Sequence, residues 1–123
     1  MEFFAIVSRQ TNADTLQARL DIASLPSRCA SITRVLSHDG DTGEIYSVWG
    51  QFSVRRELIR GGVRFSLPNC PNALAWTITT GFPPAPDKIV IHCTINRREH
   101  DADFIATLGQ FVEDWRLGLN ARL

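Results

Sequence analysis

The chain has 123 residues, 44% of them hydrophobic, and its 13 Lys and Arg balance its 13 Asp and Glu. A chain of this size buries about two-thirds of its surface on folding, which is enough for one core without disulfides or a structural metal. The composition excludes a disordered chain, and no apolar run approaches the ~20 residues that span a bilayer. We therefore expect a single soluble domain over residues 1–123, with no membrane segment.

The N-terminus and the cysteines both favour a cytoplasmic protein. The first residues lack a basic region, and the apolar run that ends at Val7 is too short for a secretory signal. Cys29, Cys70 and Cys93 are widely spaced and odd in number, so they cannot all pair within the chain. Reduced thiols are therefore expected.

The first part of the chain predicts a strand followed by a helix. Residues 3–8 form an apolar run of strand length, and residues 11–14 supply helix N-cap residues and an early acid. Apolar residues then recur at helical spacing until Pro26, which predicts that the helix ends near Leu25. Residues 31–37 fit either a strand or a second short helix, because periodicity over so short a stretch leaves both open.

The middle of the chain predicts long antiparallel strands. A turn over residues 38–43 precedes the longest strand-like stretch, residues 44–58. Two glycines after Arg60 predict a hairpin loop, and residues 63–67 form the return strand. Alternation within residues 44–58 predicts one face with Tyr46, Val48, Phe52 and Val54, and an opposite face with Ser47, Trp49, Gln51, Ser53 and Arg55.

Two further strands and a long helix complete the chain. Residues 73–80 and 88–96 alternate between apolar and polar residues, and the proline-rich residues 81–87 between them predict an extended loop. Asp101 or Asp103 is expected to cap the final helix. Its apolar stripe, at spacings of three or four, consists of Phe104, Leu108, Phe111, Trp115 and Leu119.

These elements predict an α+β fold. We expect an antiparallel meander sheet of about five or six strands, packed against an N-terminal helix and a long C-terminal amphipathic helix. The order is compatible with a sheet that wraps around the C-terminal helix, and it fits other small α+β folds equally well.

Metal, calcium and thiol sites are not favoured by the sequence. Among the histidines and cysteines, His92 and Cys93 are the only close pair, and as neighbours on a strand they point to opposite faces. Cys93 is therefore expected in the core. Residues 39–44 resemble the start of a calcium loop, but such a loop needs a glycine at its sixth position and an acid at its twelfth. Counted from Asp39, these positions hold Glu44 and Gly50. Cys70 is expected to be the exposed thiol, with no nearby group to activate it, and neither a metal nor a cofactor is predicted.

An arginine cluster is the best candidate for anion binding. The arginines around one hairpin are Arg55, Arg56, Arg60 and Arg64, and Arg97 and Arg98 follow the last strand. Such clusters bind phosphate when an aromatic residue lies alongside, and Trp49 is predicted on the face of Arg55. The alternative is a solvated sheet edge kept apart from other sheets by charge. A net charge of zero disfavours nucleic acid as a partner.

The polar face of the central strands is the most informative pattern. It combines an aromatic ring, an imidazole, amides and guanidinium groups without a carboxylate, which suits a semi-enclosed surface for a small anionic or aromatic ligand. The predicted ligand-binding residues are Trp49, Arg55, Arg64 and His92.

Two alternative functions remain open at this stage. The same face could be buried in a homodimer, because Trp and Arg are enriched at interfaces. A small enzyme could instead use His92 as a general base with Arg55 or Arg64 as the electrophilic partner. Binding is preferred to catalysis because the face offers only one titratable group of the kind that catalysis requires. All three functions, the ligand site, the homodimer and the enzyme, require Trp49, Arg64 and His92 to project from the same side of the sheet.

Overall fold

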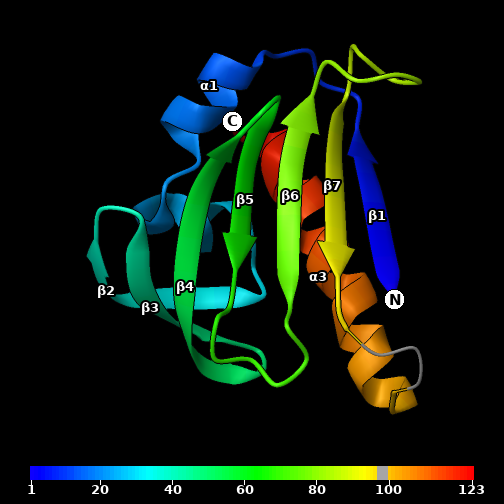
Figure 1. The fold of residues 1–123 in the computed structure, drawn as a ribbon. Helices are drawn as coiled ribbons and strands as arrows, with labels where there is room; N and C mark the ends of the chain where they lie inside the picture. Colours follow the sequence, from blue (N-terminus) through cyan, green and yellow to red (C-terminus); the bar gives the residue numbers. More distant parts are fainter. Residues whose placement is uncertain (97–99) are drawn as a thin grey trace.

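The computed structural model describes residues 1–96 and 100–123, which form one antiparallel sheet with a long helix against one face (Figure 1). The sheet has seven strands, so the α+β class and both flanking helices are confirmed while the strand count exceeds the predicted five or six. The elements in chain order are β1 (Glu2–Val7), α1 (Ala13–Arg19), η1 (Ile22–Ser24), α2 (Leu25–Arg28), β2 (Ile32–Asp39), β3 (Thr42–Ser47), β4 (Gly50–Ile59), β5 (Gly62–Ser66), β6 (Ala75–Thr80), β7 (Ile89–Thr94) and α3 (Ala102–Ala121).

Strands β2 to β7 follow one another across the sheet as a meander, and β1 joins its far edge beside β7. Helix α3 lies behind the strands in Figure 1 and runs across β1 and β7. We call the side of the sheet that faces α3 the covered face and the opposite side the outer face. Phe65, Trp76 and Ile91 point to the covered face, and their neighbours Arg64 and His92 point to the outer face.

The predicted strand over residues 44–58 is in fact a hairpin, β3 and β4, with Val48 and Trp49 as its two-residue turn. Ser47 pairs with Gly50, whose positive φ of 107° a side chain would disfavour. The Ser47 hydroxyl closes the turn, since it accepts from the Trp49 backbone N–H at 3.2 Å and donates to the Gly50 carbonyl at 3.0 Å.

This hairpin reverses the alternation that a continuous strand would have. Even-numbered residues of β3 lie opposite odd-numbered residues of β4, and Tyr46 pairs with Gln51 on the outer face. The predicted face shared by Tyr46, Phe52 and Val54 is therefore wrong for Tyr46, while Phe52 and Val54 do face α3. The physical reason is the two-residue turn, which sets even-numbered residues of β3 opposite odd-numbered residues of β4. Residues that would share a face in one continuous strand therefore point to opposite faces.

The N-terminal helical region is broken into three short segments rather than one helix. Asn12 caps α1, and its side-chain oxygen accepts from the Thr15 backbone N–H at 2.8 Å. Pro26 lies in the first turn of α2, so the prediction that it ends a helix is wrong. A first-turn residue needs no backbone donor, which is why proline is tolerated there. Of residues 31–37, left open by the sequence, residues 32–37 belong to strand β2.

The core lies between the covered face and α3. Helix α3 begins after Asp101, whose carboxylate accepts from the Asp103 backbone N–H at 3.1 Å, and its predicted apolar stripe packs on the sheet. Cys93 is fully buried in this core. Across residues 1–96 and 100–123, no helix combines the length and apolarity that crossing a bilayer would demand. The largest fully buried side chains are Phe65, Trp76, Phe111 and Trp115.

Candidate functional site

Three of the four predicted ligand-binding residues lie on the outer face. Arg64 pairs with Thr77 across β5 and β6, and Thr77 pairs with His92 across β6 and β7. Arg64 and His92 are thus two strand spacings apart, about 10 Å. Arg55 lies on the same face, opposite Ser66 of β5.

Trp49 does not share that face, so the predicted common side is wrong for this residue. Because it occupies the β3–β4 turn, its ring reaches to the side of α3. Its indole Nε1 donates to Thr107 Oγ1 at 2.8 Å, and its ring contacts Phe104 and Phe111 at centroid distances of 6.3 and 5.3 Å. The structure therefore separates Trp49 from Arg64 and His92.

The outer face also carries carboxylates, contrary to prediction. Arg64 pairs with Glu57 at 2.9 Å, and both side chains are partly exposed. His92 Nε2 lies 3.0 Å from Glu2 Oε1, and its ring stacks on Phe4 at a centroid distance of 4.3 Å. Each of these two predicted ligand-binding side chains thus already has a partner from a neighbouring strand, an arrangement that is set by cross-strand pairing.

The predicted arginine cluster is divided among unrelated roles. Arg56 is nearly buried on the covered side, where its guanidinium donates to the backbone carbonyls of Gln17 and Leu20 and pairs with Asp41 at 3.0 Å. Arg60 lies over the ring of Phe82, 6.0 Å from its centroid. With Arg64 held by Glu57, the hairpin arginines do not converge on a shared anion site. Arg97 and Arg98 lie outside the described residues.

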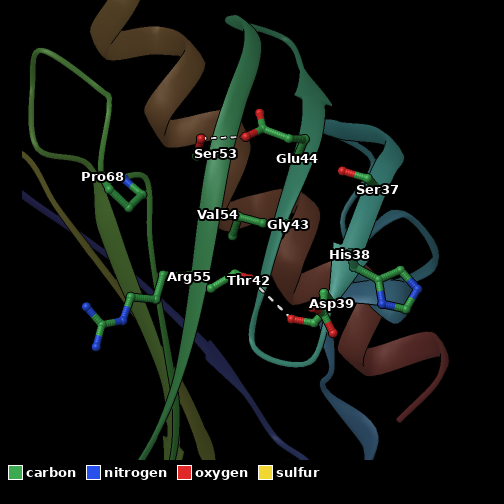
Figure 2. A pocket seen from close by; sticks show the side chains of 10 residues that line it. All are labelled: Ser37, His38, Asp39, Thr42, Gly43, Glu44, Ser53, Val54, Arg55 and Pro68. Carbon is green, nitrogen blue, oxygen red and sulfur yellow. Dashed lines mark hydrogen bonds between the residues drawn. The ribbon is translucent and has the colours of Figure 1, made fainter.

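Arg55 borders an open groove of about 390 Å³ across β2, β3 and β4 (Figure 2). Figure 2 shows its guanidinium directed away from Glu44 and His38. Glu44 accepts a hydrogen bond from Ser53 Oγ at 2.6 Å, so this carboxylate is engaged across the hairpin. Within the described part of the chain, no three His, Cys, Asp or Glu side chains are grouped to hold a metal ion. The groove is shallow and is lined mostly by polar residues.

His92 borders a second hollow of about 390 Å³ on the outer face, roofed by the proline-rich loop between β6 and β7. Its lining is mostly apolar, with His92 and Thr79 as the polar side chains, and it is completed by Phe4, Ile6, Phe82, Pro83, Pro84, Ala85 and Val90. We call this space the outer hollow.

Trp49 borders a third hollow, of about 290 Å³, between the β3–β4 turn, the β5–β6 loop and the first turn of α3. We call it the Trp49 pocket. Aromatic and aliphatic side chains dominate its lining, and Cys70 and Asn72 supply the polar groups. The other lining residues are Phe52, Leu67, Pro71, Leu74 and Phe104.

A path of aromatic rings leads from the Trp49 pocket into the core. Trp49 contacts Phe111, and Phe111 contacts Trp76 edge-on at a centroid distance of 4.9 Å. The indole Nε1 atoms of Trp76 and Trp115 are buried without a hydrogen-bond partner among the described residues. Buried tryptophans normally find an acceptor, so these two donors are an unusual feature of the core.

Sequence reasoning missed most of the Trp49 pocket. Phe104 was assigned to the helix stripe and Cys70 to an exposed turn, and nothing in their spacing joins them to Trp49. The signal that could have found the pocket is Gly50, because a glycine inside a supposed strand often marks a turn or bulge.

Burial distinguishes the three thiols. Removal from water raises the pKa of both Cys29 and Cys93 to about 12. The Cys29 thiol also donates a weak hydrogen bond to the Phe111 carbonyl at 3.8 Å. Cys70 is only partly buried and lines the Trp49 pocket. It is therefore the thiol best placed to report on that pocket.

Comparison with known proteins identifies the fold. No protein-family model matches the sequence, and no curated protein matches it. Among solved structures, the chain is similar to the XoxI protein of Bacillus cereus, with a TM-score of 0.67 and 14% identity over 98% of this chain and 93% of that chain. It is also similar to an uncharacterised protein of Bacillus thuringiensis, with a TM-score of 0.64 and 14% identity over 98% and 96% of the two chains.

A third similar structure is a START superfamily protein of Mycobacterium smegmatis, with a TM-score of 0.61 and 12% identity over 99% of this chain and 94% of that chain. At these identities the similarities establish that the chain shares the α+β fold of these three proteins and no more.

Proposed function

We propose that this domain binds a small, mostly apolar ligand in the Trp49 pocket. The observation that carries the proposal is the pocket itself, an apolar space between sheet and helix that contains two polar side chains. Ligand sites typically combine an apolar lining with a few polar groups that orient the ligand. The proposal keeps the predicted small-molecule ligand and the predicted residue Trp49, and it moves the site from the outer face to the covered side.

The lining indicates the chemistry of the ligand. Trp49, Phe52 and Phe104 offer ring faces and edges to a flat or branched apolar body, and Asn72 can hydrogen-bond to one polar group. Trp76 lies one ring behind the pocket, and its N–H has no hydrogen-bond partner among the described residues. A ligand with an acceptor at its inner end would give this donor a partner if the Phe111 ring moved aside.

The outer hollow is a second candidate for the ligand site. It is favoured by its larger volume and by His92, which is exposed to it as a hydrogen-bonding group. Arg55 and Arg64 lie on the same face but outside its lining. In this version the ligand is a flat aromatic molecule that has the stacked Phe4 and His92 rings on one side and the proline-rich loop on the other.

One titration separates the two sites. The probe is N-phenyl-1-naphthylamine, an apolar dye whose fluorescence rises on entering an apolar site. Two matched variants each fill one hollow with a phenyl ring: Cys70→Phe in the Trp49 pocket and Thr79→Phe in the outer hollow. We expect saturable binding to the wild type, a loss of about tenfold or more in Cys70→Phe, and unchanged affinity in Thr79→Phe.

The reverse pattern would move the ligand to the outer hollow, and affinity unaffected by both variants would overturn both sites. A second measurement does not depend on the folding of Cys70→Phe. In the wild type, bound probe should slow the alkylation of Cys70 by N-ethylmaleimide, because this thiol lines the proposed pocket. Native mass spectrometry of the protein as purified would reveal a retained natural ligand directly.

A further inference from the structure

The two edges of the sheet differ in how well they are protected against another strand. Edge strand β2 has two register irregularities and carries Arg34, His38 and Asp39. Edge strand β1 is regular along its whole pairing with β7, contains no proline or lysine, and has Glu2 as its only charge. Bulges and charged residues usually protect an edge strand against pairing with another strand. Strand β1 has no bulge, and Glu2 is its one charged residue.

The outer edge of β1 presents backbone groups that no other strand of the described residues pairs with. Met1 and Ile95 exchange both of their backbone hydrogen bonds, at 3.1 Å each. Antiparallel pairs alternate between bonded and non-bonded, so the backbone groups of Phe3 and Ala5 face β7 and those of Phe4 and Ile6 face away from it. Within the described ranges, β1 has no neighbouring strand on that side.

The same residues expose large apolar side chains on the outer face. Phe4 is 58% exposed and Ile6 is 51% exposed. Together with Phe82 they form a contiguous apolar patch at the margin of the outer hollow. A patch of this kind beside an open sheet edge is typical of an association surface.

The charges at the two ends of β1 are complementary to each other. Glu2 is the first residue of β1, and one of its carboxylate oxygens contacts His92 Nε2. Just beyond its end, Lys88 Nζ donates to Ser8 Oγ at 3.1 Å. A two-fold axis through the middle of β1 would therefore bring the acid of each copy to the ammonium group of the other.

We propose that two copies of this chain form a symmetric dimer by antiparallel pairing of their β1 strands. The axis passes between the two Ala5 residues, so that Phe4 of each copy lies opposite Ile6 of the other and Glu2 lies opposite Ser8. Moving the axis to Phe4 would set Glu2 opposite Ile6, a carboxylate against an apolar side chain. The chosen register pairs apolar with apolar and opposite charges with each other.

This dimer goes beyond ligand binding and rests on β1 together with Lys88 and Phe82, which lie beside it. The net charge of zero leaves no overall repulsion between the two copies. The sheet would continue through both copies, with the two apolar patches side by side on the outer face. The Trp49 pocket is not part of this interface.

Light scattering coupled to size exclusion measures the mass in solution, which should approach twice 13.8 kDa for the wild type. Ile6→Lys places a charge on the edge and should weaken dimerisation by more than about tenfold. The matched control is Leu58→Lys, which charges a similarly exposed aliphatic residue, at 58% against 51% for Ile6, away from β1 and should leave the dimer intact. Circular dichroism checks that both variants fold.

A charge exchange tests the register. Glu2→Lys and Lys88→Glu should each weaken the dimer, and the double variant should restore it. A wild-type mass of one copy at high concentration would overturn the proposal. So would equal effects of Ile6→Lys and Leu58→Lys, or a double variant no better than either single one. None of these outcomes bears on the probe titration of the Trp49 pocket, so the two proposals fail separately.

Discussion

Arg55 and Arg56 show how completely adjacent residues can differ in role. Arg55 borders an open groove on the outer face, whereas Arg56 turns to the covered side and reaches the carbonyls at the end of α1. The last carbonyls of a helix lack hydrogen-bond donors within the helix, and the Arg56 guanidinium provides donors for them. Arg56, which the sequence placed in a candidate anion site, is therefore a structural link between α1 and β4.

Replacing these two arginines should separate the roles. Arg56→Gln removes the donors to Leu20 and Gln17 and the pair with Asp41, and should lower the free energy of unfolding by about 1–3 kcal/mol. Arg55→Gln, on the exposed face, should change it by less than about 0.5 kcal/mol. Urea unfolding followed by circular dichroism measures both, and equal effects would contradict the assigned role of Arg56.

At the scale of elements, α3 contains two glycines in opposite environments. A Cβ on Gly118 would lie 1.8 Å from the Arg28 carbonyl oxygen, so this glycine allows α2 to approach the helix closely. A Cβ on Gly109 would meet nothing within 4 Å. The helix therefore requires one glycine for packing, while the other only lowers its helical propensity.

Alanine substitutions should have opposite signs at these two positions. Gly109→Ala should raise the free energy of unfolding by up to ~1 kcal/mol, because alanine favours the helix and has space. Gly118→Ala should lower it by about 1–3 kcal/mol, because α2 must move to admit the methyl group. Thermal and urea unfolding of the two variants provide the measurement. A neutral Gly118→Ala would mean that α2 and α3 are less closely packed than described.

The β3–β4 hairpin has the largest consequence of any element for the site. Its short turn places Trp49 beside α3, and its register sends Glu44 to the outer face. One unrecognised turn thus removes Trp49 from the predicted face and adds a carboxylate to it. Residues 63–96, where no turn was missed, have the alternation that the sequence predicted.

At the scale of the whole molecule, the buried thiols link stability to pH. The pKa of Cys29 and Cys93 rises from the ordinary 9.0 to about 12 in the fold. Between these values the unfolded chain has lost the thiol protons that the folded chain keeps. Their contribution to stability is thus complete below pH 9.0 and is lost as the pH rises toward about 12.

Each thiol should contribute up to ~1.4 kcal/mol per pH unit to this loss. Cys93→Ala should reduce the slope of unfolding free energy against pH in the alkaline range, relative to the wild type. Cys70→Ala removes a thiol that is only partly buried and serves as the control. Urea titrations at several pH values above 9.0 give the slopes. Parallel slopes for wild type and Cys93→Ala would contradict a buried, neutral Cys93.

The sequence by itself determined the α+β class, the flanking helices, the burial of Cys93 and most of the strands. These features depend on local periodicity and on caps such as Asn12 and Asp101, which are readable along the chain. Only the tertiary structure decided that β1 joins β7, that residues 32–37 form part of a strand, and that Trp49 meets Phe104 and Cys70. Such contacts join distant segments, and the geometry that joins them is set by turns and packing, which a periodic pattern does not contain.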